Sequence, residues 1–301
     1  MHIKIEHISK SFDGKLHIAD VSFEARPGFI SCLLGQKGAG KSTVLQMLLG
    51  ILKPDEGYIA FDDKPLNSKI LDKIGYLPEE RGLYQEFTLN EILVYFARLK
   101  HIPRKKAQVE AVRLMDRFNL IDQMETPVCE LSEEIQFRVL LLLSIIHNPD
   151  VIIFDEPFRV RDDNLVLIRK LITRLREEGK TIILSTEQIS EAELLADEIT
   201  ILHRGELILK GQKSALLERF KENIIIVEAE DNLQPLKNIP GVKRIVQEKQ
   251  VARLYVDKQM LPQKVLEAII RTVNVSRVEV HKPGLNEIYL EAVEQFERAN
   301  V

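Results

Sequence analysis

A chain of 301 residues is long enough for two domains and for a substantial buried core. Its 45% hydrophobic and 29% charged residues are typical of an ordinary globular protein and exclude a disordered or fibrous one. The formal net charge of −4 lacks the basic excess of many nucleic-acid-binding proteins, so no nucleic-acid partner is expected.

The chain begins with MHIKIEHISKSF, in which isoleucines alternate with polar residues as they do in a half-buried strand. This segment lacks the continuous apolar core of a signal peptide, so we expect the protein to stay in the cytoplasm. The most apolar segment, VLLLLSII at 139–146, is far shorter than the roughly 20 residues of a membrane-spanning helix. It predicts a buried helix instead.

Cysteine and histidine spacing indicates neither disulfides nor a structural metal site. Cys32 and Cys129 lie far apart and form no C-x-x-C pair, so we expect both to be buried thiols. The seven histidines show no spacing typical of metal ligands.

Strands and helices alternate up to about residue 220. Short, continuously apolar strands are predicted at 29–35, 150–156 and 180–186, a pattern typical of a parallel sheet covered by helices. Residues 88–148 are mostly helical in pattern and predict an inserted helical subdomain. From about Asn223, the order strand, short helix, two strands, helix, strand predicts a small α+β domain of ferredoxin-like type.

The segment GQKGAGKST (35–43) fits the phosphate-loop (Walker A) pattern G-x-x-x-x-G-K-[ST] and lies between a predicted strand and a predicted helix. Glycines let backbone N–H groups surround phosphates, Lys41 can meet the β- and γ-phosphate charge, and Ser42 can hold Mg²⁺. A glycine-rich turn is the alternative, but the strand and helix context favours ATP binding. We expect the whole loop to contact ATP: Gly35, Gln36, Lys37, Gly38, Ala39, Gly40, Lys41, Ser42 and Thr43.

The segment VIIFDEP places two carboxylates at the end of a buried strand, as in a Walker B motif. Asp155 would hold Mg²⁺ through water, and Glu156 would act as the catalytic residue that polarises an attacking water. A turn or a helix cap is the alternative for an isolated pair of acids. The accompanying phosphate loop favours the functional interpretation.

Five motifs occur in the order and approximate spacing of the nucleotide-binding domain of ATP-binding cassette (ABC) proteins, and the chain resembles this family from residue 1 to about 220. The motifs are the phosphate loop, IGYLPEERGLY (74–84), LSEEIQFRV (131–139), NPDVIIFDEP (148–157) and IILSTEQISEAE (182–193). YLPEERGLY and PGLNEIYLEAVE (283–294) resemble bacterial ABC-2-type exporter ATPases in particular.

The resemblance implies a P-loop NTPase core with a parallel sheet, an antiparallel β subdomain and the helical subdomain at about 88–148. It implies a nucleotide-binding domain at 1–220 and a small C-terminal domain at 223–298. Phe12 takes the place of the aromatic residue that stacks on adenine. Glu79 occupies the Q-loop position and would reach Mg²⁺ or water; a solvated acidic turn is the alternative.

Three motifs depart from the family pattern. Where relatives have L-S-G-G-Q, a helix start that binds the γ-phosphate of ATP held by the opposite subunit, this chain has Ser132 followed by Glu133, Glu134 and Ile135. The usual S-G-L-D reads RVRD and keeps only Asp162, and the switch histidine is Glu187. The acids suit a well-capped helix, because Ser132 is a good N-cap and carboxylates favour the first turn. The resemblance instead implies a lost or altered trans-phosphate site.

Two functions are consistent with these motifs. One is the energy-coupling subunit of an exporter, which uses ATP and Mg²⁺ to drive separate integral-membrane subunits from the inner face of the cell membrane. The other is a regulatory subunit that binds ATP, hydrolyses little of it and pairs with a typical ABC ATPase. Homodimer and heterodimer both remain open. Soluble ABC proteins of DNA repair or translation fit poorly, because neither a second cassette nor a long coiled-coil insertion is present.

Overall fold

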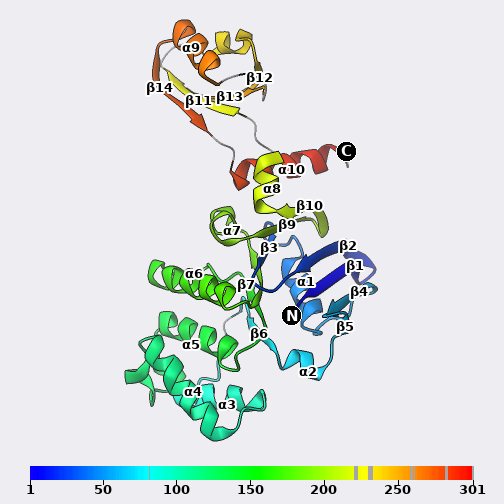
Figure 1. The fold of residues 1–301 in the computed structure, drawn as a ribbon, viewed down its shortest axis with the longest axis vertical. Coiled ribbons are helices and arrows are strands. Elements are labelled where there is room, and N and C mark those ends of the chain that lie inside the picture. Colours follow the sequence, from blue (N-terminus) through cyan, green and yellow to red (C-terminus); the bar gives the residue numbers. More distant parts are fainter. Residues whose placement is uncertain are drawn as a thin grey trace. The chain divides into compact units, whose positions relative to one another are not determined.

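The computed structural model describes residues 1–80, 82–219, 223–229, 233–257, 260, 262–281 and 284–299. Two compact units, Met1–Gln212 and Lys213–Val301, make up the chain (Figure 1). The predicted domain limits of 1–220 and 223–298 stay predictions, because residues 220–222 lie outside the described residues. Among the described helices, none combines the length and the apolar character needed to cross a membrane.

The first unit is built on a ten-stranded sheet whose parallel part carries the strand ends that matter for function. All residues of the central strands are buried, which explains their continuously apolar sequences. The register pairs Asp155 with Ser185, so the ends of two neighbouring strands meet. In sheet order, the parallel strands are β9 (Glu198–His203), β3 (Ile30–Leu34), β8 (Thr181–Thr186), β7 (Val151–Asp155) and β6 (Ile74–Leu77).

The remaining strands form the predicted antiparallel β subdomain. Ile3, Ile5 and Ile8 of β1 are buried, which confirms the half-buried strand predicted at the N-terminus. A single pair, Glu206 with Ala19, joins this part to the rest of the sheet. The strands of this part are β5 (Lys64–Pro65), β4 (Glu56–Phe61), β1 (Ile3–Phe12) and β2 (Lys15–Ala25). Glu206 belongs to β10 (Glu206–Gln212), which lies between β2 and β9 and pairs antiparallel with β9.

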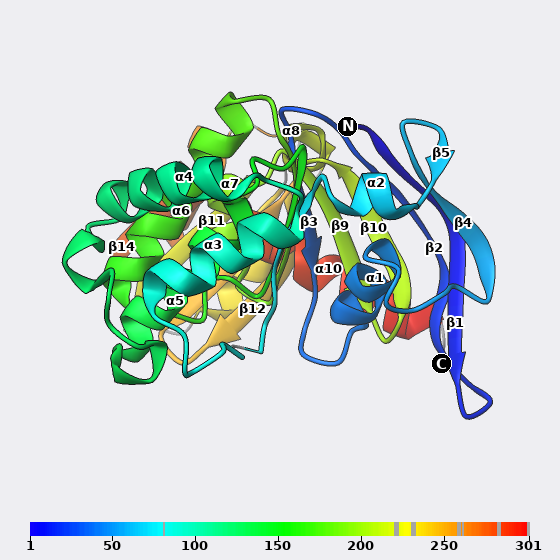
Figure 2. The same ribbon diagram turned by 90° about the horizontal axis from the view of Figure 1, so that it is seen from below.

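Helices of the first unit fall into two groups, and Figure 2 shows α3, α4 and α5 together, apart from β1, β2 and β4. Thr88 and Glu91 form a reciprocal capping box that starts α3. The apolar segment at 139–146 is buried, as predicted for this part of α5. The first group forms the helical subdomain and contains α3 (Leu89–Leu99), α4 (Arg104–Arg117), η1 (Ile121–Gln123), η2 (Val128–Glu130) and α5 (Glu133–Ile145). The others are α1 (Lys41–Leu48), α2 (Ser68–Leu71), α6 (Asp162–Glu177) and α7 (Ile189–Leu195).

One of the two cysteines differs from the prediction. Cys32 is buried in β3, but Cys129 is exposed. Cys129 lies in the single 3-10 turn η2, where the neighbouring Val128 takes the inward position and directs Cys129 outward. The expectation that both thiols are buried is therefore wrong for Cys129.

The second unit contains an antiparallel sheet of order β12-β13-β11-β14 with its own apolar core. This order, with one helix after the first strand and one after the third, confirms the predicted ferredoxin-like arrangement. The elements are α8 (Lys213–Arg219), β11 (Asn223–Ala229), η3 (Gln234–Asn238), β12 (Val242–Glu248), β13 (Val251–Val256), α9 (Pro262–Thr272), β14 (Val275–His281) and α10 (Leu285–Ala299).

The half-buried ring of His147 makes the stability of the first unit dependent on pH. Its Nε2 lies 3.0 Å from the carbonyl oxygen of Ile74, and its Nδ1 has no partner. Burial, helped by the nearby Lys100 cation, lowers the pKa of His147 from 6.5 to about 4. Between these values the unfolded chain binds a proton that the folded chain excludes, so stability is lost as the pH falls from 6.5 towards 4.

We expect the free energy of unfolding to decrease by up to about 3 kcal/mol through this group over that pH range. Urea denaturation at pH 7.5 and at about pH 4.5 measures the decrease. His147→Gln should show a smaller decrease than the unmodified protein, whereas His101→Gln, which changes a 79% exposed histidine, should not. Equal decreases in His147→Gln and the unmodified protein would contradict the assignment.

Candidate functional site

The loop between β3 and α1 has the backbone conformation that a phosphate cradle requires. Gly38 and Gly40 have φ values of 84° and 98°, which side chains other than glycine rarely adopt. A Cβ atom at Gly35 would lie 2.4 Å from the carbonyl oxygen of Leu202, so this position also excludes a side chain. Helix α1 starts without a side-chain cap. Its first N–H groups are therefore available to an anion, and the loop fits a phosphate chain.

Lys41 is buried at the base of this loop and is 6% exposed. Its Nζ donates to the carbonyl oxygens of Gly35 (2.7 Å) and Gln36 (3.2 Å). The same atom lies 2.9 Å from Oε1 of Glu156, at an angle outside hydrogen-bond geometry. Lys41 thus connects the loop with the carboxylate predicted to activate water.

A cavity of about 180 Å³ brings the phosphate loop together with two of the predicted acids, Glu79 and Glu156. The cations Lys41 and Arg159 line the same cavity. The lining residues are His17, Lys37, Gly38, Gly40, Lys41, Ser42, Thr43, Glu79, Glu156 and Arg159.

Asp155 and Ser42 meet beside the cavity in an arrangement that suits a divalent cation. Oδ1 of Asp155 accepts hydrogen bonds from the hydroxyls of Ser42 (3.3 Å) and Ser185 (2.5 Å). Burial raises the pKa of Asp155, and these two hydrogen bonds oppose the increase. A carboxylate and a hydroxyl oxygen next to a phosphate cradle are the donors that Mg²⁺ takes in nucleotide sites, so these residues fit the ion.

Glu156 is held in a strained conformation directly after β7. Its φ of 47° is unusual for a residue other than glycine and costs roughly 1–3 kcal/mol, as often observed at functional sites. Its N–H donates to Oγ of Ser185 at 3.0 Å, and its Oε2 accepts from the N–H of Glu187 at 3.3 Å. Oε1 has no hydrogen bond, so it can accept one from a water molecule.

Arg159 is a site residue that the sequence patterns did not single out. Its guanidinium forms ion pairs with Glu79 and with Glu187, the latter at 2.8 Å, and Nε lies 3.9 Å from Glu156. Burial opposes ionisation, but the hydrogen bond to Glu187 and the surrounding carboxylates raise the pKa of Arg159. The sequence signal that could have indicated Arg159 is the joint occurrence of Glu79, Glu187 and this arginine in motifs that otherwise resemble the family pattern.

Glu79 follows β6 and is one third exposed, near the partly buried Tyr76. Burial, and then the charges of Asp155 and Glu79, raise the pKa of Tyr76 to about 12. Arg81, the last residue of the PEER stretch, lies outside the described residues. Glu79 thus contributes to a negative potential at the predicted magnesium position.

Phe12 lies at the end of β1 and is 41% exposed. Its ring meets the ring of His17 edge to face, with centroids 5.5 Å apart, and His17 lines the phosphate cavity. An exposed aromatic ring next to a residue of the cavity lining is available for stacking. Its role as the adenine contact stays a prediction.

The altered signature residues lie at a second cavity of about 380 Å³ rather than at the phosphate loop. Ser132 caps α5 by accepting from the N–H of Ile135 at 3.4 Å. Glu133 and Glu134 line this cavity, and Oε1 of Glu134 pairs with Arg161 at 2.9 Å. Asp162 is exposed at the start of α6. A single chain therefore does not bring the signature to its own phosphate loop.

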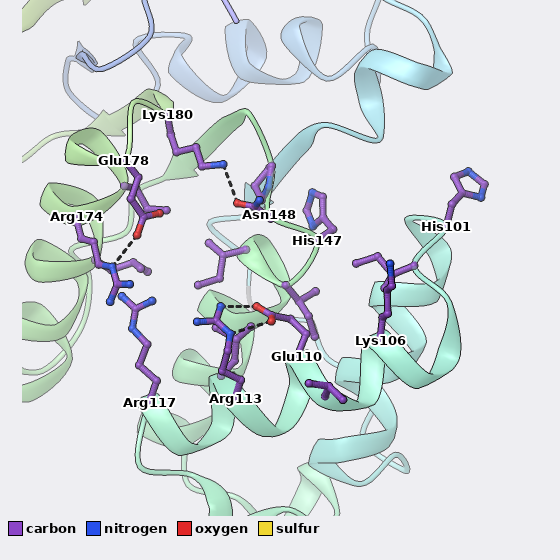
Figure 3. Close-up of a pocket in the computed structure, with 18 of the residues that line it drawn as sticks. His101, Lys106, Glu110, Arg113, Arg117, His147, Asn148, Arg174, Glu178 and Lys180 are labelled. Carbon is purple, nitrogen blue, oxygen red and sulfur yellow. Dashed lines mark hydrogen bonds and ion pairs between the residues drawn. The ribbon is translucent and has the colours of Figure 1, made fainter.

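A larger cavity, of about 890 Å³, contains none of the predicted site residues. Figure 3 shows its lining at α4 and α6, where Glu110 pairs with Arg113 and Glu178 with Arg174. Lys180 donates to Asn148 at 2.8 Å. Cavity size alone therefore does not locate the chemistry in this molecule.

Comparison with known proteins agrees with the site geometry. The sequence model of the ABC transporter family matches residues 18–159. An ABC transporter ATP-binding protein of Alkalihalophilus pseudofirmus is 33% identical over 262 residues, which cover 87% of this chain and 98% of that protein. The chain belongs to the ABC transporter ATP-binding proteins. This ABC ATPase carries a second match, at residues 211–293, to the C-terminal domain of DrrA1-3-like ATP-binding proteins.

Two further similarities concern export and assembly. The Nod factor export ATP-binding protein I of Burkholderia thailandensis is 33% identical to the ABC ATPase over 220 residues, 72% of each chain. The structure of cbiO1 from Clostridium perfringens, part of the ABC transporter complex cbiONQ, has a TM-score of 0.64 and 26% identity and covers 72% of this chain and 91% of that one. The family resemblance and the fold class are thereby confirmed.

Proposed function

We propose that this ABC ATPase is the energy-coupling subunit of a bacterial ABC-type exporter, located at the inner face of the cell membrane. The observation that carries the ATP-dependent part is the cavity that unites Lys41, Ser42 and Glu156 beside Asp155. The exporter part is supported by the DrrA-like match and by the Nod factor export relative.

Residues in and beside the cavity have distinct tasks in this function. Lys41 and the N–H groups at the start of α1 bind the phosphates. Ser42 and Asp155 would hold Mg²⁺, which supplies charge neutralisation at the phosphates when bound, whereas Glu79, the third predicted ligand, is paired with Arg159. Glu156 takes the proton of the attacking water through Oε1, which lies 2.9 Å from the cation of Lys41 but accepts no hydrogen bond. Phe12 would stack on the adenine.

Integral-membrane subunits are the proposed partners, as cbiO1 has partners in its own complex. An aromatic surface at the start of the helical subdomain supports such a contact, and Tyr84, Tyr95 and Leu99 on it are 56%, 40% and 53% exposed. Phe87 stacks on Tyr95 with centroids 5.6 Å apart. Exposed aromatic clusters of this kind are enriched at protein interfaces.

Co-purification from detergent-solubilised membranes tests the exporter assignment. We expect a multi-spanning membrane protein to accompany the tagged chain, and Tyr84→Ser with Tyr95→Ser to reduce its recovery at least severalfold. Tyr58→Ser alters another exposed tyrosine, 53% exposed and outside the aromatic surface, and should not reduce recovery. Exclusive recovery of partners that are not membrane proteins contradicts the assignment.

A regulatory subunit with little hydrolysis is the second candidate, and the acids at the signature and switch positions favour it. It would pair with a typical ABC ATPase. The altered signature and the altered switch residue of this chain would then belong to two different ATP sites. Comparing ATP turnover by the purified chain with turnover by its complex distinguishes the two functions. Robust hydrolysis by the chain alone contradicts the regulatory role.

Restoring the signature with Glu133→Gly, Glu134→Gly and Ile135→Gln should increase ATP-dependent dimerisation and hydrolysis. A carboxylate about 4 Å from a phosphate charge is repelled by about 4 kcal/mol at an effective dielectric constant of about 20. This upper figure exceeds the typical helix-dipole contribution of about 0.3–1 kcal/mol. Arg161 offsets part of the charge of Glu134, but it is 83% exposed and therefore well screened. Size-exclusion chromatography with ATP measures dimerisation; a folded, ATP-binding variant that gains neither property contradicts the repulsion.

A further inference from the structure

Three carboxylates from three different loops converge on Arg159, which lines the phosphate cavity. Glu79 follows β6, Glu156 follows β7 and Glu187 follows β8, and these strands are adjacent and parallel in the sheet. Parallel neighbours end at the same edge, which places the three loops side by side. The phosphates of ATP would add further negative charge to this edge. Unless a cation intervenes, the arrangement opposes phosphate binding.

Arg159 is the cation that meets all three carboxylates. One terminal nitrogen contacts Glu79, the other lies 2.8 Å from Glu187, and Nε lies 3.9 Å from Oε2 of Glu156. A planar guanidinium can serve several acceptors in different directions at once, which a lysine ammonium does with less geometric control. Arg159 therefore connects the ends of three strands through one side chain.

Lys41 and Arg159 approach opposite oxygens of Glu156. Lys41 lies 2.9 Å from Oε1, and Arg159 lies nearest to Oε2. When Lys41 engages the phosphates, its pairing with Glu156 weakens. Among the described residues, Arg159 is the other cation within 4.0 Å of this carboxylate. It then keeps Glu156 in place together with the N–H of Glu187.

We propose that Arg159 is a positioning residue that holds Glu79 and Glu187 away from the phosphates and orients Glu156 towards the attacking water. The proposal rests on ATP hydrolysis at this cavity. In that reaction the water oxygen forms a bond to the γ-phosphorus while the bond from that phosphorus to the β–γ bridging oxygen breaks. Glu156 accepts the proton of the water, and ADP and phosphate leave. Arg159 takes no part in bond formation.

Steady-state kinetics and calorimetry on full-length variants test this role. Arg159→Gln removes the charge and keeps a polar side chain; we expect kcat to fall at least tenfold and the Kd for MgATP to rise by a smaller factor. Arg159→Lys should retain an intermediate kcat, because it keeps a charge without the planar geometry. Arg174→Gln, which changes an arginine paired with Glu178 on α6, is the matched control and should leave both constants within about twofold.

A charge-neutralised background separates the two parts of the role. In Arg159→Gln combined with Glu79→Gln and Glu187→Gln, the carboxylates that repel phosphate are gone, so the Kd should return to within about threefold of the unmodified value. The kcat should remain low, because Glu156 still lacks Arg159. Thermal unfolding of each variant confirms that folded proteins are compared.

An unchanged or increased kcat in folded Arg159→Gln overturns the inference, as does a decrease no larger than that of Arg174→Gln. Failure of the neutralised variant to regain ATP affinity overturns the counter-charge part. If the unmodified chain and its complex bind no ATP, the proposed function fails instead. The two failures are therefore distinguishable.

Discussion

Replacing Lys41 with alanine is expected to raise the Kd for MgATP at least tenfold, equivalent to about 1.4 kcal/mol or more. Lys41 is the buried cation of the phosphate loop, and its loss removes the charge that meets the β- and γ-phosphates. It also removes the two hydrogen bonds that hold the carbonyl oxygens of Gly35 and Gln36. Both effects act in the same direction, because a loosened loop presents its N–H groups less well.

Isothermal titration calorimetry with MgATP measures this change. Lys53→Ala, which removes an exposed lysine outside the cavity, is the matched control and should leave the Kd unchanged. Circular dichroism should show both variants folded. An unchanged affinity in Lys41→Ala would remove the phosphate loop from the proposed site.

Replacing Glu156 with glutamine should preserve MgATP binding and reduce hydrolysis roughly 100-fold or more, the usual contribution of a positioned general base. The amide keeps the shape of the side chain but cannot accept the proton of the attacking water. Its loss of charge weakens the pairing with Lys41, which frees that cation for the phosphates. Binding should therefore not weaken.

Phosphate release under saturating MgATP measures the rate, in the transporter complex if the isolated chain turns over slowly. Glu56→Gln makes the same chemical change at an exposed residue of β4 and serves as the control. Persistence of the full rate in Glu156→Gln would show that another group activates the water.

Local patterns in the sequence determined most of the fold. Continuous apolar strands predicted the parallel sheet, because strands buried on both faces tolerate few polar residues. The alternating strand at the N-terminus predicted the half-buried β1, and the order of elements after Asn223 predicted the second sheet correctly. These predictions succeed because the period of apolar residues follows directly from the geometry of each element. The prediction for Cys129 rested on the general burial of free cysteines and was wrong, since a single 3-10 turn has no period that indicates which side faces inward.

The phosphate loop was also determined by the sequence alone. Its glycines, lysine and serine lie within one continuous segment, so their spacing in the sequence determines their arrangement in space. The two acids of VIIFDEP follow the same logic, because a strand end places adjacent residues predictably. The assignment of these residues as the site, and of Glu156 as the base, remains a prediction for the experiments above.

Only the tertiary structure decided what surrounds the altered residues. Glu79 and Glu187 are 108 positions apart in numbering, yet both reach Arg159 because β6, β7 and β8 are neighbours in the sheet. Likewise, Glu134 meets Arg161 through the packing of α5 beside α6. The effect of a charged side chain depends on the charge that it contacts as well as on its own position. Partners that are separated by whole helices and strands produce no local pattern in the sequence. The sequence therefore determined which acids are present, and the fold determined which cations they meet.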